Sequence, residues 1–443
     1  MKRIKEVKGS RIQVKYMGMT SQFIIFFSVF FSLYGSMHFY VYRKITSQTA
    51  FPGVVNIAII IFLTLMVVSP ILSRTFTSKR IDGLGYILTV VSSFWIGFVF
   101  YLFLINVGVD LINTSSRIIS RAVFGGDPSL LIPKSYPTFF LIILIVIGIC
   151  TYAYFEALNI RITRITIQTS KLPEDVEELV IAQISDVHLG VLVGEKRLKK
   201  ITRIIREVNP DILFSTGDLV DGNLDIMRGL AEEFRGINPR FGKYAVTGNH
   251  EFYAGIERSV RFTEDSGFML LRNQYVNLNG IINLIGLDDP TAKSFKNRAG
   301  EDISKLFSRC NPNLFTILLY HQPRKFREKA LIMPIDLQLS GHTHKGQLFP
   351  FNLITHIFFP LQGGFFEING KKLYASRGTG TWGPPLRFLS SPEIVVIKLE
   401  KTGMKPTCLK ETQRISKTSL RGAVATKQSD RNGWCFVSLR GSQ

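Results

Sequence analysis

Residues 179–190 read Leu-Val-Ile-Ala-Gln-Ile-Ser-Asp-Val-His-Leu-Gly, an apolar run that ends in a polar loop. The apolar part predicts a buried β-strand, because it is short and rich in branched side chains. Asp186 and His188 follow it two residues apart, so on extended backbone their side chains point to the same side. The pair can therefore hold one metal ion.

Four later segments repeat this pattern. They are Ser215-Thr-Gly-Asp-Leu-Val-Asp-Gly222, Val246-Thr-Gly-Asn-His-Glu251, Leu319-Tyr-His-Gln-Pro323 and Leu339-Ser-Gly-His-Thr-His-Lys345. The five loops contain five of the 7 histidines, a clustering that packing does not explain. Asp218 has enough lone pairs to bridge two cations, and His342 and His344 share the spacing of the first pair. Nitrogen and oxygen ligands without thiolate favour Mn, Fe or Zn.

The five blocks in this order resemble the calcineurin-like metallophosphoesterase superfamily, whose pattern is Asp-x-His, Gly-Asp-x-x-Asp, Gly-Asn-His-Glu/Asp, His and Gly-His-x-His. The resemblance covers residues 179–399, and five spaced blocks are far more specific than one. Further segments at 341–347, 373–380, 385–388 and 392–393 resemble the membrane-associated YkuE/YaeI type. Lys345 departs from that type, which often has glycine there, and adds a cation beside the metals.

The resemblance implies two divalent metal ions and a role for each motif residue. One ion would be held by Asp186, His188 and His344. The other would be held by Asn249, His321 and His342, with Asp218 bridging the pair. His250 would donate a proton to the leaving oxygen or stabilise its charge, and Asp221 would orient His250.

Several acidic residues near these loops have two interpretations. Asp221 either caps a turn or assists catalysis. Glu251 is expected to start a helix after its loop. Asp288 and Asp289 precede a proline, so they are expected to form a turn, with substrate contact as the alternative.

Two arginines and two histidines are ambiguous in the same way. Arg377 and Arg387 either pair within the structure, which base rates favour, or bind a phosphate. His38 and His356 have no metal-binding neighbours and are assigned to packing or to the membrane interface. Six phenylalanines follow the last metal motif, and they either fill the core or form an apolar lip that meets the bilayer or admits an acyl chain. They are Phe349, Phe351, Phe358, Phe359, Phe365 and Phe366.

Four segments in the first third of the chain lack acidic and basic residues: 21–42, 54–73, 83–109 and 135–155. Each reaches the roughly 20 residues needed to cross a bilayer, so we predict four transmembrane helices. The first follows six cations like a signal peptide, but no small-x-small cleavage site comes after it. Cations before the first segment and in the second loop favour the cytoplasm for both ends, which predicts a multi-pass protein of the cell (inner) membrane with a cytoplasmic catalytic domain.

The net charge of +21 is uneven along the chain. Residues 1–170 have 16 basic and 5 acidic residues, residues 171–400 have 29 and 26, and residues 401–443 have 9 and 2. The middle of the chain is therefore nearly neutral, which argues against a long nucleic acid as partner. The 4 cysteines are far apart and indicate neither a disulfide framework nor a zinc site.

Four parts are predicted from these patterns: a basic segment (1–20), a four-helix membrane anchor (21–158), a metallophosphoesterase domain (172–400) and a basic, disordered tail (401–443). The third part alternates strands with helices, which predicts an α/β fold with layers in the order αββα. The expected strands are 179–184, 211–215, 244–247, 281–285, 315–320, 337–340 and 394–399. The expected helices are 195–208, 224–235, 256–266 and 323–331.

The predicted function is a membrane-anchored binuclear-metal phosphoesterase that hydrolyses a phosphodiester, pyrophosphate or phosphomonoester. Its partners would be the lipid bilayer and a phosphate ester, and relatives acting on nucleotide-linked acylated sugars suggest a lipid-linked substrate such as UDP-diacylglucosamine. One alternative is a nuclease or nucleotide phosphodiesterase. Another is a non-catalytic transport or signalling protein, which is disfavoured because no metal ligand is missing and no expected span contains a charged residue.

Overall fold

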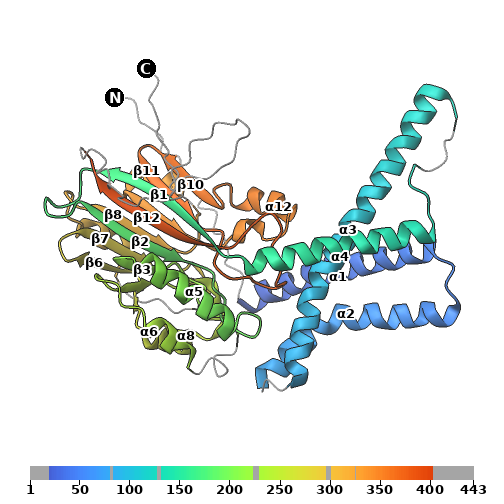
Figure 1. Cartoon of the computed structure of the whole chain (residues 1–443), viewed down its shortest axis with the longest axis horizontal. Coiled ribbons are helices and arrows are strands. Elements are labelled where there is room, and N and C mark those ends of the chain that lie inside the picture. Colours follow the sequence, from blue (N-terminus) through green and yellow to red (C-terminus); the bar gives the residue numbers. More distant parts are fainter. Residues whose placement is uncertain are drawn as a thin grey trace, which may run out of the picture.

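The computed structural model of the chain describes residues 19–79, 83–126, 131–222, 229–295, 301–324 and 326–402. A region of long helices is followed by an α/β domain (Figure 1). The expected basic segment at 1–20 and the expected tail at 401–443 lie almost entirely outside the described residues.

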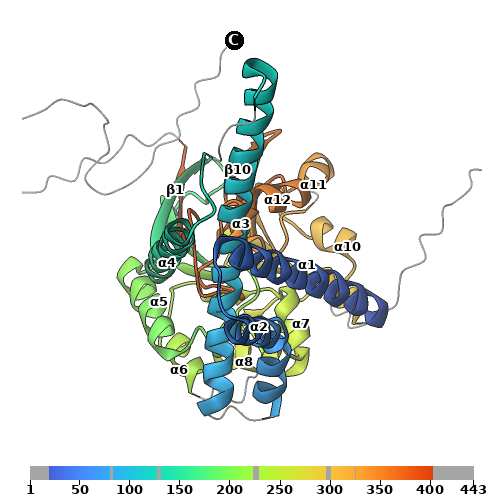
Figure 2. The same ribbon diagram turned by 90° about the vertical axis from the view of Figure 1, so that its right-hand side faces the viewer.

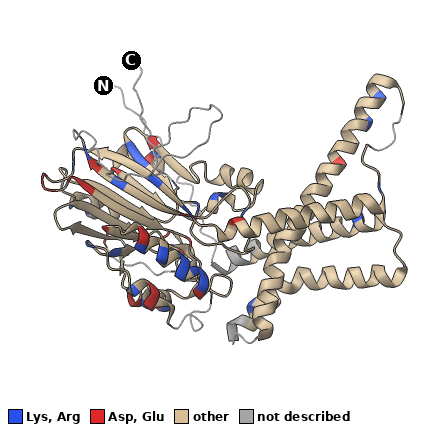
Figure 3. Ribbon diagram, in the orientation of Figure 1, with Lys and Arg blue, Asp and Glu red and all other residues tan. Residues whose placement is uncertain are grey.

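The long helices are α1 (Met19–Gln48), α2 (Gly53–Lys79), α3 (Gly83–Phe124) and α4 (Tyr136–Leu158). Within the described residues, three helices are long and apolar enough to cross a membrane. They are α2, over Gly53–Phe76, and the whole of α3 and α4. Few charged residues lie on them, whereas the α/β domain carries many of both signs (Figure 3). The first expected span forms as α1 but is not among these three candidates, so four spans were expected and three are found.

Helix α3 is longer than expected and crosses the other long helices (Figure 2). It continues through Arg117 and Arg121, which the sequence placed in a loop. It also includes Asp110, whose carboxylate accepts a hydrogen bond from Tyr40 (2.6 Å) and pairs with Lys44 of α1. The expected span 83–109 has no charged residue, but the helix continues beyond it and includes Asp110, Arg117 and Arg121.

The α/β domain contains two six-stranded sheets. In spatial order, the first has β1 (Arg161–Thr169), β12 (Glu393–Lys401), β2 (Glu178–Ile184), β3 (Ile212–Ser215), β4 (Lys243–Ala245) and β5 (Met269–Leu270). The second has β10 (Gly364–Ile368), β11 (Lys371–Ala375), β9 (Leu337–Ser340), β8 (Phe315–Tyr320), β7 (Ile282–Leu287) and β6 (Gln274–Leu278). All seven expected strands are present within these sheets.

The two sheets pack face to face through one apolar core, to which Ile181 and Phe214 contribute from the first sheet and Ile317 and Leu339 from the second. Helices cover the outer faces, with α5 and α6 on one side and α10 and α11 on the other (Figure 2). Together with α8, these helices have the following bounds: α5 (Glu195–Val208), α6 (Leu230–Arg235), α8 (Ile256–Asp265), α10 (Ile303–Ser308) and α11 (Phe326–Ile332). The expected αββα layering is confirmed. The expected helix at 224–235 is described only from residue 229, and α11 starts later than residue 323.

Strand β1 joins the two regions directly. Helix α4 ends at Leu158 and β1 begins at Arg161, where it pairs in parallel with β12. The first sheet therefore includes residues before position 172, at which the sequence placed the domain boundary. Only two residues separate α4 from the sheet.

Candidate metal centre

The five motif loops follow the carboxyl ends of five strands. Strands β2, β3 and β4 run parallel in one sheet, and β8 and β9 run parallel in the other. Because parallel strands end at the same edge of a sheet, the loops that follow them come together there. These loops carry Asp186, Asp218, Asn249, His321 and His342.

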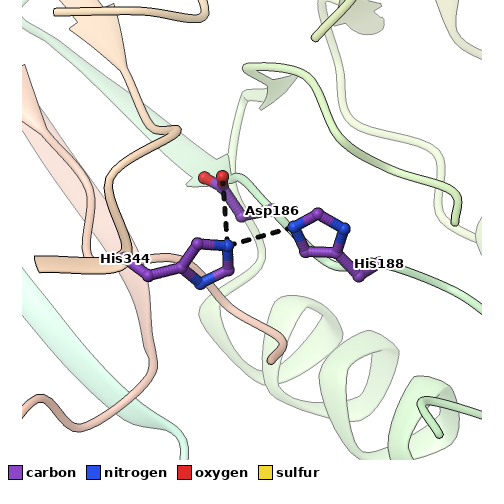
Figure 4. Close-up of side chains that lie close together, drawn as sticks. All are labelled: Asp186, His188 and His344. Carbon is purple, nitrogen blue, oxygen red and sulfur yellow. Dashed lines mark hydrogen bonds and ion pairs between the residues drawn. The ribbon is translucent and has the colours of Figure 1, made fainter. Parts of the chain in front are cut away.

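The first cluster consists of Asp186, His188 and His344, whose ligand atoms all lie within 4.8 Å of one another. His344 lies between the other two (Figure 4). Its Nε2 is 3.0 Å from Nε2 of His188 and 3.5 Å from Oδ1 of Asp186. All three residues are buried. The set matches the one expected for the first ion.

The second cluster consists of Asp218, His321 and His342. Nε2 of His321 is 3.1 Å from Oδ2 of Asp218 and 3.2 Å from Nδ1 of His342. The same Nδ1 lies 3.0 Å from Oδ1 of Asn249, which completes the expected set. Oδ2 of Asp218 is also 3.8 Å from Nε2 of His188 in the first cluster, so this carboxylate lies between the two.

The protonation of these histidines fits metal binding. Burial lowers the pKa of His188 to about 4 and that of His342 to about 3, so both rings are neutral and offer lone pairs. His321 differs: burial disfavours its charge, but Asp218 outweighs burial and holds its pKa well above the ordinary value. A metal ion would displace that proton. The neutral nitrogens and carboxylate oxygens that face one another form a donor set suited to Mn, Fe or Zn.

The backbone is strained where these side chains are presented. Five expected ligands have positive φ: Asp186 (51°), His188 (51°), Asp218 (52°), His342 (72°) and His344 (47°). For a residue with a side chain this conformation costs roughly 1–2 kcal/mol. Such strain concentrates at functional sites, where the surrounding structure enforces it.

Two motif glycines are required by close approach. A Cβ atom at Gly248 would lie 2.1 Å from Oδ1 of Asp218, and one at Gly341 would lie 2.1 Å from Oδ2 of Asp186. Neither carboxylate can move without leaving its cluster. Glycine at these positions therefore lets the loops approach closely enough to form the site.

His250 lies beside both clusters and pairs with Asp221. Its Nδ1 is 3.0 Å from Oδ1 of Asp221, and its backbone N–H donates to Asp218 (2.8 Å). Burial disfavours a charge on His250, but the two aspartates outweigh it and raise its pKa to about 9. The ring is therefore a cation at neutral pH. With His188, these residues also form a third compact group.

Glu251 has a larger role than the expected helix start. It lies in the first turn of α7 (Asn249–Ala254), and its carboxylate accepts from the backbone N–H of Gly248 at 2.6 Å. It also accepts from the N–H groups of Asp218 (3.0 Å) and Leu219 (2.7 Å). One buried side chain thus ties the loop after β3 to the loop after β4.

The two consecutive aspartates before Pro290 have structural partners. Asp288 accepts from the guanidinium of Arg272 at 3.0 and 2.8 Å. Asp289 accepts from the backbone N–H of Thr291 (2.9 Å), as a turn former does, and from the side chain of Gln322 (2.8 Å).

The two arginines also have protein partners. Arg377 pairs with the buried Glu393. Arg387 is fully buried and donates to Nδ1 of His344 (2.8 Å), to the carbonyl of the same residue (3.1 Å) and to the carbonyl of Gly380 (2.6 Å). These contacts favour pairing within the structure over phosphate binding for both arginines. Arg387 also orients His344, an expected metal ligand.

Helix α4 supports the loop that carries Arg387. The backbone N–H of Arg387 donates to the carbonyl of Ala153 at 2.9 Å. Glu156 accepts from the backbone N–H of Leu389 (3.0 Å) and from Oγ of Ser391 (2.7 Å). A candidate membrane helix is thereby connected through one loop to His344.

We expect Arg387→Lys to weaken metal binding about tenfold to a hundredfold, the range typical for residues that orient a metal ligand. Lysine lacks the planar fork that reaches three acceptors at once. Metal titration by calorimetry measures this effect, and thermal unfolding without metal measures any general loss of stability. Arg203→Lys, on the exposed face of α5, is the control. Unchanged metal affinity in Arg387→Lys would contradict the positioning role.

The remaining candidate residues lie outside the clusters. His38 is buried among the long helices and bonds to the carbonyl of Tyr34 (2.7 Å) and to the indole of Trp95 (2.8 Å). His356 is exposed on α12 (Phe351–Phe358). Of the six phenylalanines, Phe365 and Phe366 are half-buried in β10. Phe349, Phe351 and Phe358 are exposed, so core filling does not explain the whole group.

A cavity of about 310 Å³ opens beside the second cluster. Asn249 and His342 line it on the side of the clusters. Tyr253, Gln322 and Arg324 line it as well, so a ligand there would meet hydrogen-bonding groups and one cation.

Comparison with known proteins agrees with this geometry. The family model of the calcineurin-like phosphoesterases matches residues 179–346, which include all five motif loops. An uncharacterized metallophosphoesterase of Aquifex aeolicus is 38% identical over 254 residues, which are 57% of this chain and 96% of that protein. The uncharacterized metallophosphoesterase YkuE of Bacillus subtilis is 34% identical over 264 residues, which are 56% of this chain and 88% of that protein.

A longer relative is named as a transmembrane protein. This transmembrane protein with metallophosphoesterase domain, from Danio rerio, is 34% identical over 251 residues, which are 54% of this chain and 57% of that protein. The chain thus spans most of the two bacterial relatives and little more than half of the fish protein.

Proposed function

The chain belongs to the calcineurin-like phosphoesterase family of metal-dependent phosphoester hydrolases, and we propose that it uses two divalent ions to hydrolyse a phosphodiester, pyrophosphate or phosphomonoester at a membrane surface. One observation carries the proposal. Seven residues from five separate loops converge in two buried clusters, and Asp218 lies between them.

We assign the ions to the residues that the motifs predict. Asp186, His188 and His344 would hold one. Asn249, His321 and His342 would hold the other, and Asp218 would contact both. When bound, two such ions activate a water molecule and neutralise charge on the phosphoryl oxygens. We propose Mn, Fe or Zn, because the donor set contains nitrogen and oxygen without thiolate.

His250, held by Asp221, would donate a proton to the leaving group. The His250 ring carries a proton, and Asp221 holds its Nδ1 at 3.0 Å, so Nε2 is the atom left to face a substrate. A cationic imidazole beside the leaving oxygen can donate its proton as the bond to phosphorus breaks. The cavity lined by Asn249 and His342 is the place from which a substrate would reach both clusters.

We propose that α2, α3 and α4 hold the enzyme in the cell (inner) membrane, with the catalytic domain in the cytoplasm. Attachment to the membrane is supported by the length and apolar composition of these helices, and by the Danio rerio relative, which is named as a transmembrane protein. The cations at the end of α2 and directly after it, Arg74, Lys79 and Arg80, support a cytoplasmic catalytic domain, because two further crossings by α3 and α4 return the chain to their side of the membrane.

The substrate proposal follows from this attachment. A lipid-linked phosphoester, such as a pyrophosphate of the UDP-diacylglucosamine type, is confined to the membrane plane where the enzyme is held. A soluble nucleotide is the second candidate, since its phosphodiester would suit the same clusters. The near-neutral charge of residues 171–400 disfavours a long nucleic acid.

We expect the full chain, purified in detergent, to hydrolyse bis(4-nitrophenyl) phosphate when Mn²⁺ is added. Chelation should abolish release of nitrophenol, and added metal should restore it, because the buried ligands cannot activate water alone. A screen of lipid extracts for phosphate or nucleotide release would then identify the natural substrate. A chain that binds two ions and hydrolyses no phosphoester would support the non-catalytic alternative instead.

A further inference from the structure

Helix α12 presents an apolar face that the α/β domain does not cover. None of its eight residues is buried. Leu353, Ile354, Ile357 and Phe358, here called the α12 apolar face, are 61%, 49%, 73% and 67% exposed. Their spacing places them on one side of the helix. An exposed patch of this kind marks a surface that binds another apolar body.

The position of α12 brings this face close to the candidate membrane helices. The helix lies at the edge of the α/β domain nearest the long helices (Figure 1). The hydroxyl of Tyr101 in α3 donates to the carbonyl of Phe349 (3.0 Å), and the rings of Phe100 and Phe351 are 6.4 Å apart. Both α3 residues lie in the uncharged stretch 83–109, which is the part of α3 suited to lipid. The start of α12 and the residues just before it therefore contact the uncharged part of a candidate membrane helix.

One aromatic residue connects this face to the candidate site. Phe359 follows α12 directly, and its ring centre is 5.1 Å from that of His342. The guanidinium of Arg324 lies 4.5 Å from the centre of the same ring. Arg324 and His342 both line the 310 Å³ cavity. An apolar surface and a polar cavity with one cation thus meet at Phe359.

We propose that the enzyme takes its substrate from the membrane: a phosphoester with a long acyl or alkyl chain, whose chain lies along the α12 apolar face and whose phosphate enters the cavity beside Arg324. A short, soluble phosphoester would contact the cavity but would not reach the α12 apolar face. The inference rests on the proposed phosphoesterase function and adds the surface that binds the alkyl chain and the route by which the phosphate enters.

Two esters with the same reacting group test this proposal. Hexadecyl 4-nitrophenyl phosphate and methyl 4-nitrophenyl phosphate differ only in the alkyl chain, and both release nitrophenol. The full chain, reconstituted in phosphatidylcholine vesicles with Mn²⁺, should have a kcat/KM at least about tenfold higher for the hexadecyl ester, because chain binding lowers the energy of the transition state. Equal values for the two esters would overturn the proposal, whereas hydrolysis of neither would overturn the proposed function itself.

Variants assign the preference to α12. We expect Ile357→Ser/Phe358→Ser to lower the ratio of the two kcat/KM values about tenfold, because two large apolar side chains are lost from the face. The matched control is Met269→Ser/Ile303→Ser, which removes exposed apolar residues from β5 and α10 and should leave the ratio unchanged. An unchanged ratio in the α12 variant, or an equal fall in the control, would show that the face does not bind the chain.

A substitution at Arg324 tests the proposed phosphate position independently of the alkyl chain. Arg324→Gln should raise KM for both esters about tenfold, because a charge-assisted contact to the phosphate is lost whatever the alkyl chain. An unchanged KM for both esters would exclude the cavity as the entry point of the phosphate.

Discussion

Asp218→Asn is expected to lower kcat/KM for a phosphodiester by about a thousandfold or more and to leave fewer than two metal ions per chain. The carboxylate lies between the clusters, with Oδ2 3.1 Å from Nε2 of His321 and 3.8 Å from Nε2 of His188. Asparagine has nearly the same shape but carries no charge, and its amide nitrogen cannot ligate a cation. One substitution should therefore weaken both metal positions.

The substitution also keeps the local backbone in place. Oδ1 of Asp218 accepts from the backbone N–H of His250 at 2.8 Å, and the amide oxygen of asparagine can accept the same bond. Hydrolysis of bis(4-nitrophenyl) phosphate and elemental analysis of the purified chain measure the two effects. Asp175→Asn, at an exposed position before β2, is the control and should behave as wild type. Full activity with two ions in Asp218→Asn would exclude a bridging role.

The residues that could be predicted from sequence are those whose role follows from local spacing. Asp186 and His188 flank one residue at the end of an apolar strand and lie in one cluster, as their spacing predicted, whereas His342 and His344 repeat this spacing but lie in different clusters. The fold followed from the same segments, because each apolar run before a motif forms a strand. Family resemblance then predicted the division of the ligands between two ions, which stays a prediction; in the structure Asp186 and His188 group with His344, and Asp218 groups with His321 and His342.

Other features depend on contacts between distant segments. Glu156 is 233 residues from Leu389, whose N–H it binds, and no local pattern indicates that contact. Strand β1 was not predicted; it is an edge strand whose pairing with β12, far along the chain, no local pattern indicates. The length of α3 was underestimated because Asp110 was taken as its end, although pairing with Lys44 lets the helix continue past it.

His250→Ala is expected to lower the rate of hydrolysis while both metal ions remain bound. His250 is next to the expected ligand Asn249, yet its Nδ1 lies 3.0 Å from Oδ1 of Asp221, and it belongs to neither of the two expected ligand sets. Removing a metal ligand, as in His342→Ala, should instead reduce both the metal content and the rate. Elemental analysis of the two variants therefore separates a catalytic histidine from a ligand.

The leaving group distinguishes proton donation from general electrostatic stabilisation. If the protonated ring of His250 donates to the leaving oxygen, its loss should cost about a thousandfold for an alkyl leaving group, which departs poorly as an anion. It should cost no more than about tenfold for nitrophenol, which departs readily without a proton. His356→Ala, which removes the exposed histidine of α12, is the control with the same short, soluble esters. An equal loss for both leaving groups would mean that His250 contributes charge alone, because only proton transfer depends on the basicity of the departing oxygen.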